Sequence, residues 1–279
     1  MFINKEFSDL QKTAYLYQKQ YAKAEPFPHI MLDNFFDEIY LDNILKVFPD
    51  LSSNKKSIKF NNQAEIKLAT KRGEGMPSEI RNFLRYLNSH EFIDFLQVLT
   101  SLKEPLIPDP HFIGGGLHEM KRGGLLKIHA DFCRHPETNL DRRLNLLLYL
   151  NKNWKESYGG EIQLWNKEMK SHIKFLPIFN RLVIFNTTDY TYHGLPDPIN
   201  CPSNMSRKSL AVYYFSNGRP SSELRPKNIN QSSIFVRRPN EKFEEGPNEN
   251  FDNSKIRLKI FLKQIMPPIL FNYLKKYRK

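Results

Sequence analysis

The chain has 279 residues, of which 40% are hydrophobic, so it can bury the core of one large domain with terminal extensions. No apolar run approaches the roughly 18 residues of a membrane span, and two cysteines are too few for a disulfide framework; we therefore expect a soluble, cytoplasmic protein. The formal net charge of +12 does not predict a nucleic-acid partner, because eight Lys or Arg and no acid lie between Ser254 and Lys279.

The first hundred residues predict helices. Residues 1–24 are expected to form a helical extension, and three later segments carry apolar residues at the three- and four-residue spacing of a helical stripe. These stripes are Leu41, Ile44, Leu45, Phe48; Ile80, Phe83, Leu84, Leu87; and Phe92, Phe95, Leu96, Leu99. Such helices should buttress a sheet. Residues 51–78 are rich in Lys, Asn and Ser, which predicts an excursion or lid rather than core.

Beyond about Gly116 the pattern changes to short strands separated by turn residues. The expected strands are Leu125–Asp131, Leu144–Leu150, Glu161–Trp165, Ile173–Leu176, Arg181–Phe185 and Lys208–Phe215. Short strands at these intervals favour a jelly roll, with a core at about residues 105–217. The fold class is therefore α+β with a mainly β core.

A metal site is predicted at the end of the first of these strands. His129 and Asp131 are two residues apart, so they lie on one strand face, roughly 6.6 Å apart along the chain. His193 supplies a third ligand from far along the sequence. Two imidazoles and one carboxylate that leave open positions are typical of non-haem Fe(II) oxygenases.

One His-x-Asp pair is a weak signal alone, but the order of the features strengthens it. His193 is followed by Gly194, and then Arg207 and Ser209 open the last strand. A different metal site, zinc between Cys133 and His135, lacks a Cys-x-x-Cys partner, so an ordinary free thiol is the better interpretation. The basic residues around the motif are expected to form a solvated rim: Lys121, Arg122, Lys127, Arg134, Arg142 and Arg143.

The C-terminal part predicts two further segments. Residues 221–253 show no clear periodicity and are expected to form an irregular wrap. Residues 254–279 form a basic amphipathic tail, with apolar residues at helical spacing on both sides of Pro267. Its apolar faces either pack on the domain, which we favour, or contact an anionic membrane surface or an acidic partner.

Several motifs together resemble the iron(II)- and 2-oxoglutarate-dependent dioxygenases, in particular the prolyl-4-hydroxylase-like branch. They are Gly123–Asp131 (GGLLKIHAD), Arg143–Asn151 (RLNLLLYLN), Gly159–Trp165 (GGEIQLW), Asn180–Phe185 (NRLVIF), His193–Gly194 and Arg207–Tyr214 (RKSLAVYY). Pro26–Phe36 (PFPHIMLDNFF) is similar to the first strand of many members. The resemblance covers roughly residues 25 to 220 and implies a double-stranded β-helix as the catalytic domain.

The resemblance also implies the cofactors and the reaction. His129, Asp131 and His193 would hold Fe(II), and 2-oxoglutarate and O2 would take the remaining positions. Arg207 suits the distal carboxylate of 2-oxoglutarate because a guanidinium meets a carboxylate with two parallel hydrogen bonds. Ser209 and Tyr149 are candidates for further hydrogen bonds to the same cofactor, and ascorbate is a candidate reductant.

The implied activity is hydroxylation coupled to oxidative decarboxylation of 2-oxoglutarate to succinate and CO2. Asp131 favours hydroxylation, since halogenating relatives lose this carboxylate. The expected substrate is a small molecule or a peptide: a peptidyl proline, or a small amino-acid-like or glycan-linked molecule. Two other classes stay open: a zinc-dependent hydrolase, which leaves Arg207 and Ser209 without a purpose, and a non-catalytic jelly-roll binding module.

Overall fold

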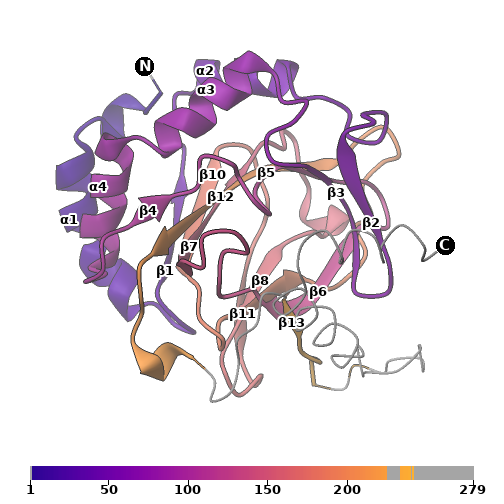
Figure 1. Cartoon of the computed structure of the whole chain (residues 1–279). Helices are drawn as coiled ribbons and strands as arrows, with labels where there is room; N and C mark the ends of the chain where they lie inside the picture. The colour runs from indigo at the N-terminus through magenta and orange to yellow at the C-terminus, as the bar shows by residue number, and fades with distance from the viewer. Residues whose placement is uncertain (1, 225–232, 240, 242–279) are drawn as a thin grey trace, which may run out of the picture. The chain divides into compact units, whose positions relative to one another are not determined.

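The computed structural model describes residues 2–224, 233–239 and 241. The chain divides into two compact units, Met1–Pro239 and Asn240–Lys279, and the first contains every element named below (Figure 1). The predicted basic tail, residues 254–279, lies outside the described residues, as does most of the expected wrap over residues 221–253.

Four α-helices confirm the helical pattern of the first hundred residues: α1 (Leu10–Lys23), α2 (Glu38–Lys46), α3 (Ser78–Leu87) and α4 (His90–Thr100). Three begin at a side-chain cap, because Asp9, Asp37 and Ser89 each accept a hydrogen bond from a backbone N–H in the first turn. Short 3-10 helices occur at Lys5–Phe7, Glu156–Tyr158 and Ser221–Glu223.

The strands form one antiparallel sheet that folds into a jelly roll. Its order is β1 (His29–Asp33), β10 (Arg181–Asn186), β7 (Asp141–Tyr149), β12 (Arg207–Ser216), β5 (Gly116–Met120), β3 (Glu65–Thr70), β6 (Leu125–Ala130), β11 (Tyr192–Leu195), β8 (Ile162–Trp165) and β9 (His172–Phe175). Three short strands join it from the side: β2 (Ser57–Asn61), β4 (Ile107–Pro108) and β13 (Ile234–Phe235). The expected double-stranded β-helix is thus confirmed.

Alternation along the strands separates the two faces of this sheet. On β7, Leu144, Leu146 and Leu148 are fully buried in the cluster that includes the apolar faces of the helices. Figure 1 shows these helices gathered on one side of the sheet. The intervening residues of β7, Asn145 and Tyr149 among them, therefore face the interior of the jelly roll, where the site lies.

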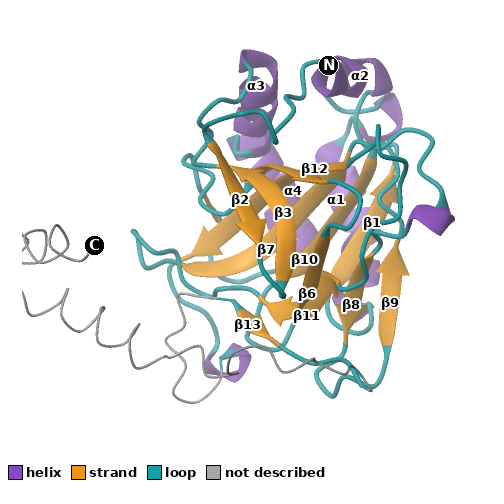
Figure 2. Ribbon diagram, turned by 90° about the vertical axis from the view of Figure 1, so that its right-hand side faces the viewer, coloured by secondary structure: helices purple, strands orange, loops and turns teal. Residues whose placement is uncertain are grey.

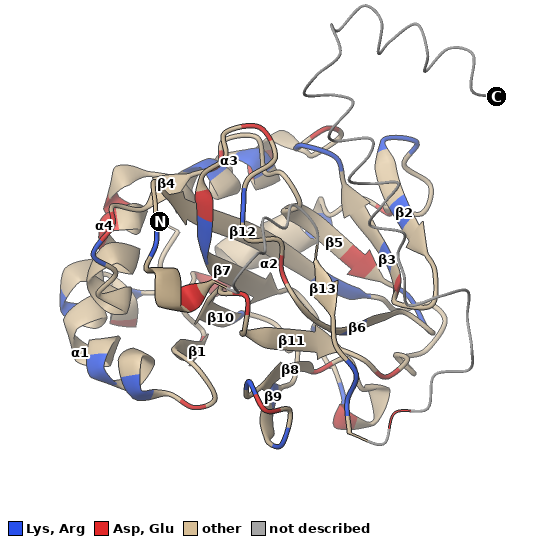
Figure 3. Ribbon diagram, turned by 60° about the horizontal axis from the view of Figure 1, so that its bottom comes forward, with Lys and Arg blue, Asp and Glu red and all other residues tan. Residues whose placement is uncertain are grey.

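The polar stretch 51–78 contains more structure than the sequence predicted. It forms the hairpin β2–β3, and β3 pairs with both β5 and β6, so it connects the two halves of the sheet (Figure 2). The hairpin still fits an excursion from the core, since Ile58 and Ile66 are each 38% exposed. Figure 3 shows Lys and Arg along it. Ile58 and Phe60 alternate with Lys59 in the two-residue period of a strand, and Ile66 and Leu68 do so around Lys67. Each run holds only two such apolar residues within a polar stretch, so the signal is short.

The segment expected to be irregular also differs from its prediction. Residues 234 and 235 form strand β13, which pairs with β6 at Ala130 and His129. Two residues are too few for a periodic pattern, so this strand had no signal in the sequence.

Candidate active site

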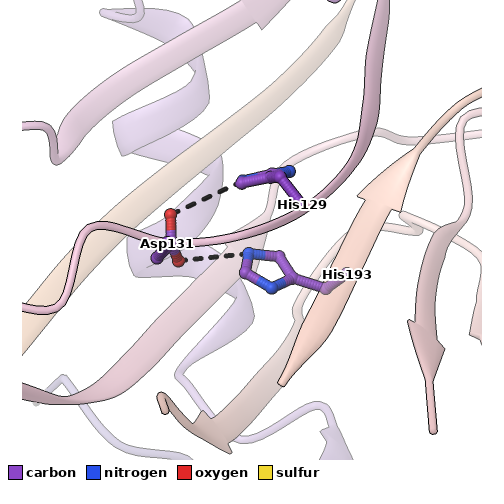
Figure 4. Close-up of side chains that lie close together, drawn as sticks. All are labelled: His129, Asp131 and His193. Atoms are coloured by element: carbon purple, nitrogen blue, oxygen red, sulfur yellow. Dashed lines mark ion pairs between the residues drawn. The ribbon is translucent and has the colours of Figure 1, made fainter. Parts of the chain in front are cut away.

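The three predicted metal ligands meet in the interior of the jelly roll. His129 lies near the end of β6, Asp131 follows that strand directly, and His193 on β11 pairs with His129 across the ladder. One potential ligand atom from each lies within 4.8 Å of the other two, and no other such group of His, Cys, Asp or Glu occurs in the described part of the chain. Figure 4 shows the two imidazoles turned toward the carboxylate.

Backbone carbonyls fix how the imidazoles are oriented. The Nδ1 atoms of His129 and His193 lie 2.8 Å and 3.2 Å from the carbonyl oxygens of Lys127 and Thr191. A carbonyl oxygen only accepts hydrogen bonds, so each Nδ1 carries the hydrogen and each Nε2 presents its lone pair. The Nε2 atoms lie 3.5 Å and 3.1 Å from Oδ1 and Oδ2 of Asp131.

The electrostatics of the cluster favour a bound cation. Burial, and then the neighbouring His193, lower the pKa of His129. Burial acts to raise the pKa of Asp131, but the Arg142 guanidinium and His193 outweigh it and hold that pKa well below its usual value. The lone pair of the neutral His129 imidazole thus faces a half-buried carboxylate, and His193 approaches the other oxygen of that carboxylate. A divalent ion would satisfy this arrangement, and its mixture of nitrogen and oxygen donors suits Fe(II).

Arg142 and Asn145 support Asp131, a role that the sequence did not predict for either residue. The Asn145 amide donates to Asp131 Oδ2 at 2.7 Å, and Arg142 Nη2 lies 2.9 Å from the same oxygen. The guanidinium also donates twice to Asn145 Oδ1, at 2.9 and 2.6 Å. It lies between two aromatic rings, 4.5 Å from the centroid of Phe132 and 3.4 Å from that of Tyr213.

The expectation of a solvated basic rim is therefore wrong for Arg142 and Arg143, which are 1% and 2% exposed. Arg143 is paired with Glu104 and Glu223. The register between β7 and β12 shifts between Leu144 and Arg142, and this irregularity lets Arg142 reach Asn145 and Asp131. Simple alternation along β7 does not predict that contact.

Arg207 lies in a second part of the interior, at the start of β12, and is 4% exposed. Its Nε donates to the carbonyl of Gly160 at 2.8 Å, and its guanidinium carbon lies 4.7 Å from the centroid of the Tyr149 ring. Burial lowers the pKa of Arg207. Among the described residues, no carboxylate lies within ion-pair distance of this guanidinium. A buried cation without its counter-ion is costly unless a ligand supplies the charge.

Tyr149 and Ser209 are the other two candidates for the cofactor pocket. Both are buried, and they face each other across β7 and β12. By hydrogen-bond geometry the Tyr149 hydroxyl has no partner in the part of the chain described. Burial raises the pKa of Tyr149, and the neighbouring Arg207 guanidinium acts in the opposite direction. Tyr149 packs in a cluster with Phe185, whose ring lies 4.8 Å from that of His193, so the two parts of the site share one interior.

The alternative zinc pair is not assembled. Nδ1 of His135 accepts hydrogen bonds from two backbone N–H groups, and its Nε2 lies 3.5 Å from a carboxylate oxygen of Asp109. These contacts give His135 a structural role.

None of the helices in the described residues combines the length and the apolar character that a membrane span requires.

Comparison with known proteins agrees with this geometry. Residues 115–215 match the family model described as the 2OG-Fe(II) oxygenase superfamily. A prolyl-4-hydroxylase from Pseudomonas putida is similar in structure, with a TM-score of 0.55 and 13% identity over 74% of this chain and 100% of that one.

Two further prolyl hydroxylases share the fold. One, from Trichoplax adhaerens, was solved with a hypoxia inducible factor oxygen degradation domain peptide fragment; its TM-score is 0.56, with 17% identity over 76% of this chain and 92% of that one. The other, from Phytophthora capsici, has a TM-score of 0.51 and 20% identity over 77% of this chain and 67% of that one. The match of residues 115–215 confirms the predicted family: the chain contains a 2OG-Fe(II) oxygenase domain and is a 2-oxoglutarate-dependent dioxygenase.

Proposed function

We propose that this dioxygenase hydroxylates a small-molecule or peptide substrate, with His129, Asp131 and His193 as the iron ligands and Arg207 as the anchor of 2-oxoglutarate. The observation that carries the proposal is the pairing of two features in one interior. A cluster of lone pairs converges on a point between two buried imidazoles and a half-buried carboxylate, and a buried guanidinium nearby has no carboxylate partner in the described chain.

Iron(II), when bound, supplies the activation of dioxygen that is coupled to conversion of 2-oxoglutarate into succinate and CO2. The protein's own part is to hold and orient. The carbonyls of Lys127 and Thr191 keep both Nε2 lone pairs directed at the cluster. Asn145 and Arg142 engage Asp131 Oδ2 and leave Oδ1 as the less engaged oxygen.

At the other part of the site, Arg207 binds the distal carboxylate of 2-oxoglutarate with paired hydrogen bonds. The Tyr149 hydroxyl donates to the same carboxylate, which would give this buried group the hydrogen-bond partner that it lacks among the described residues. Ser209 adds a third donor from the adjacent strand position. The apolar walls around Tyr149 exclude water, which strengthens each of these hydrogen bonds.

The substrate is proposed from chemistry and likeness together. The fold shared with prolyl hydroxylases, one of them solved with a peptide fragment, supports a peptidyl proline or a small amino-acid-like or glycan-linked molecule. The carboxylate of Asp131 in the ligand set supports hydroxylation. Ascorbate stays a prediction as reductant.

Two rival functions leave observed features without a purpose. A zinc-dependent hydrolase has no use for the buried guanidinium of Arg207, which lacks a carboxylate partner among the residues described. A non-catalytic binding module does not need three side chains that converge on one point, each held by a second group.

The test is 2-oxoglutarate turnover by the full chain with Fe(II), measured as succinate release over a panel of peptidyl-proline and amino-acid-like substrates. We expect iron-dependent succinate formation that His129→Ala and Asp131→Ala abolish. Full activity in either variant would mean that the substituted residue is not an iron ligand. A protein that retains zinc and ignores 2-oxoglutarate would favour the hydrolase.

A further inference from the structure

Strand β6, which carries His129, has two edges, and the second of them is covered by two different segments. Along one edge β6 pairs with β11, which carries His193. Along the other edge β3 reaches only as far as Leu125 and Leu126, and the carbonyl of Ala64 accepts from Lys127 N–H at 2.8 Å. The rest of that edge, the part that holds His129, would be left with open backbone groups, which are costly and invite wrong pairing.

Strand β13 fills this gap. Ile234 pairs with Ala130 and Phe235 with His129, and the N–H of Val236 donates to the carbonyl of Ile128 at 2.8 Å. These residues lie well outside residues 115–215, the part that matches the family model, and outside the catalytic domain that the sequence predicted.

The two faces of this short strand have different partners. Val236 packs in the apolar cluster of Ile128, Ala130, Trp165 and Tyr192. Phe235 lies directly opposite His129, so its ring is on the same face as the imidazole, 5.5 Å away between centroids. On its other side the His129 ring is 4.5 Å from that of His193. Phe235 is 36% exposed, so one side of the ring is open.

An ion pair anchors the end of the segment to the second ligand strand. The Arg238 guanidinium meets Asp197 with two contacts of 2.9 and 2.8 Å. Asp197 follows β11, which ends at Leu195. Residues 234–238 therefore contact both ligand strands. β13 pairs with β6, which carries His129, and Arg238 meets Asp197, which follows β11, the strand that carries His193.

We propose that residues 234–238 form a clasp that keeps the two ligand strands in register, with Phe235 as a positioning residue for His129. The proposal rests on the proposed function, since it assumes that His129 binds the iron. Phe235 limits rotation of the imidazole and keeps water from that side of the ligand, while the Arg238–Asp197 pair holds the clasp in place. Loosening either contact widens the range of His129 geometries and lets the metal leave faster.

The test is a chelator challenge. The full-length protein is loaded with Fe(II) without oxygen, an excess of a coloured ferrous chelator is added, and the release rate is followed by absorbance. We expect Phe235→Ala and Arg238→Ala to release iron on the order of 10-fold faster than the unaltered chain. Phe235→Leu, which keeps an apolar contact, should release iron at a rate between those of the alanine variants and that of the unaltered chain.

A charge exchange provides the sharpest comparison. Asp197→Arg alone should release iron quickly, and Asp197→Arg combined with Arg238→Asp should recover most of the original rate, because the ion pair is restored with reversed charges. Lys152→Ala is the matched control, since it removes an ion pair with Asp42 that lies on other elements.

The outcomes separate the clasp from the proposed function. If the unaltered chain binds no Fe(II), the proposed function fails. If it binds Fe(II) but Phe235→Ala and Arg238→Ala release it at the original rate, only the clasp is overturned. A lower Tm of the metal-free variants with unchanged release would also overturn it, because a merely structural strand produces that result. Should Phe235→Ala not fold, the iron-release rates of Phe235→Leu and of the charge-exchange variants test the clasp instead.

Discussion

Arg207 is the residue on which recognition of 2-oxoglutarate depends most. It is buried, held through Nε by the Gly160 carbonyl, and free of any carboxylate partner among the described residues. Arg207→Lys keeps the charge but loses the planar fork, and Arg207→Met loses both.

A charge-assisted hydrogen bond contributes about 1.5–3 kcal/mol, so we expect the Kd for 2-oxoglutarate to rise roughly 10- to 100-fold, more for Met than for Lys. Calorimetric titration of the iron-loaded protein measures this, with iron affinity as the internal control. An unchanged Kd in Arg207→Met would place the cofactor elsewhere.

Asn145 shows how a neutral side chain can govern a metal ligand. It donates to Asp131 and accepts from Arg142, so Asn145→Ala leaves Asp131 Oδ2 with Arg142 alone and the guanidinium short of a partner. We expect the variant to lose roughly 10- to 100-fold in Fe(II) affinity, as is usual when a group that orients a ligand is removed.

Asn151→Ala is the matched control for this change. Asn151 donates to the carbonyls of Pro177 and Lys208, which are buried contacts that do not touch the ligands. Both variants should lose about 1–3 kcal/mol of stability, but only Asn145→Ala should bind iron more weakly. Equal iron affinities in an equilibrium titration would assign Asn145 a purely structural role.

At the scale of elements, the turn before β8 shapes the cofactor pocket. Gly160 has a positive φ of 79°, and a Cβ there would lie 3.2 Å from Arg207 Cδ and 3.3 Å from Ile199 Cγ1. Gly160→Ala should therefore displace Arg207 and weaken 2-oxoglutarate binding several-fold.

Gly123 is the control that separates backbone strain from side-chain crowding at Gly160. It has a similar φ of 84°, but a Cβ there would meet nothing within 4 Å. Both alanine variants should lose on the order of 1 kcal/mol from the left-handed backbone, measured by urea unfolding. Only Gly160→Ala should bind 2-oxoglutarate more weakly, and equal binding by the two would contradict the packing of Gly160 on Arg207.

The elements also show how far the sequence predicts the site. The strands that carry His129, Tyr149 and Arg207 have clear apolar patterns, and the two-residue spacing of His129 and Asp131 identifies a shared face. The sequence predicts a solvated Arg142, whereas the residue is buried against Asp131, because its contacts follow from a register shift between β7 and β12 that no side-chain pattern marks. The clasp was missed because a two-residue strand has no period, and its partners are far away in sequence.

For the whole molecule, metal binding and folding should be linked. A ligand that binds only the folded state at 100 times its Kd adds about 2.7 kcal/mol of stability. In a domain of this size that corresponds to a rise in Tm of roughly 5–10 °C. We expect Mn(II), a redox-stable substitute for Fe(II), to produce this rise in the unaltered chain.

The ligand variants supply the control for that shift. His129→Ala and His193→Ala should show little or no increase in Tm with Mn(II) in a thermal scan, since two ligands no longer form a site. A rise of the same size in either variant would mean that the ion stabilises the molecule through another group.

The central claim is that His129, Asp131 and His193 hold one ferrous ion to which 2-oxoglutarate is added, with Arg207 at its far end. Anaerobic titration of the full chain with Fe(II) and then 2-oxoglutarate tests it most directly through the visible charge-transfer absorption of the ternary complex. We predict that the band appears at one equivalent of each component, requires much more 2-oxoglutarate in Arg207→Met, and is absent in Asp131→Ala. A full band in Asp131→Ala, or none in the unaltered chain, would contradict the account.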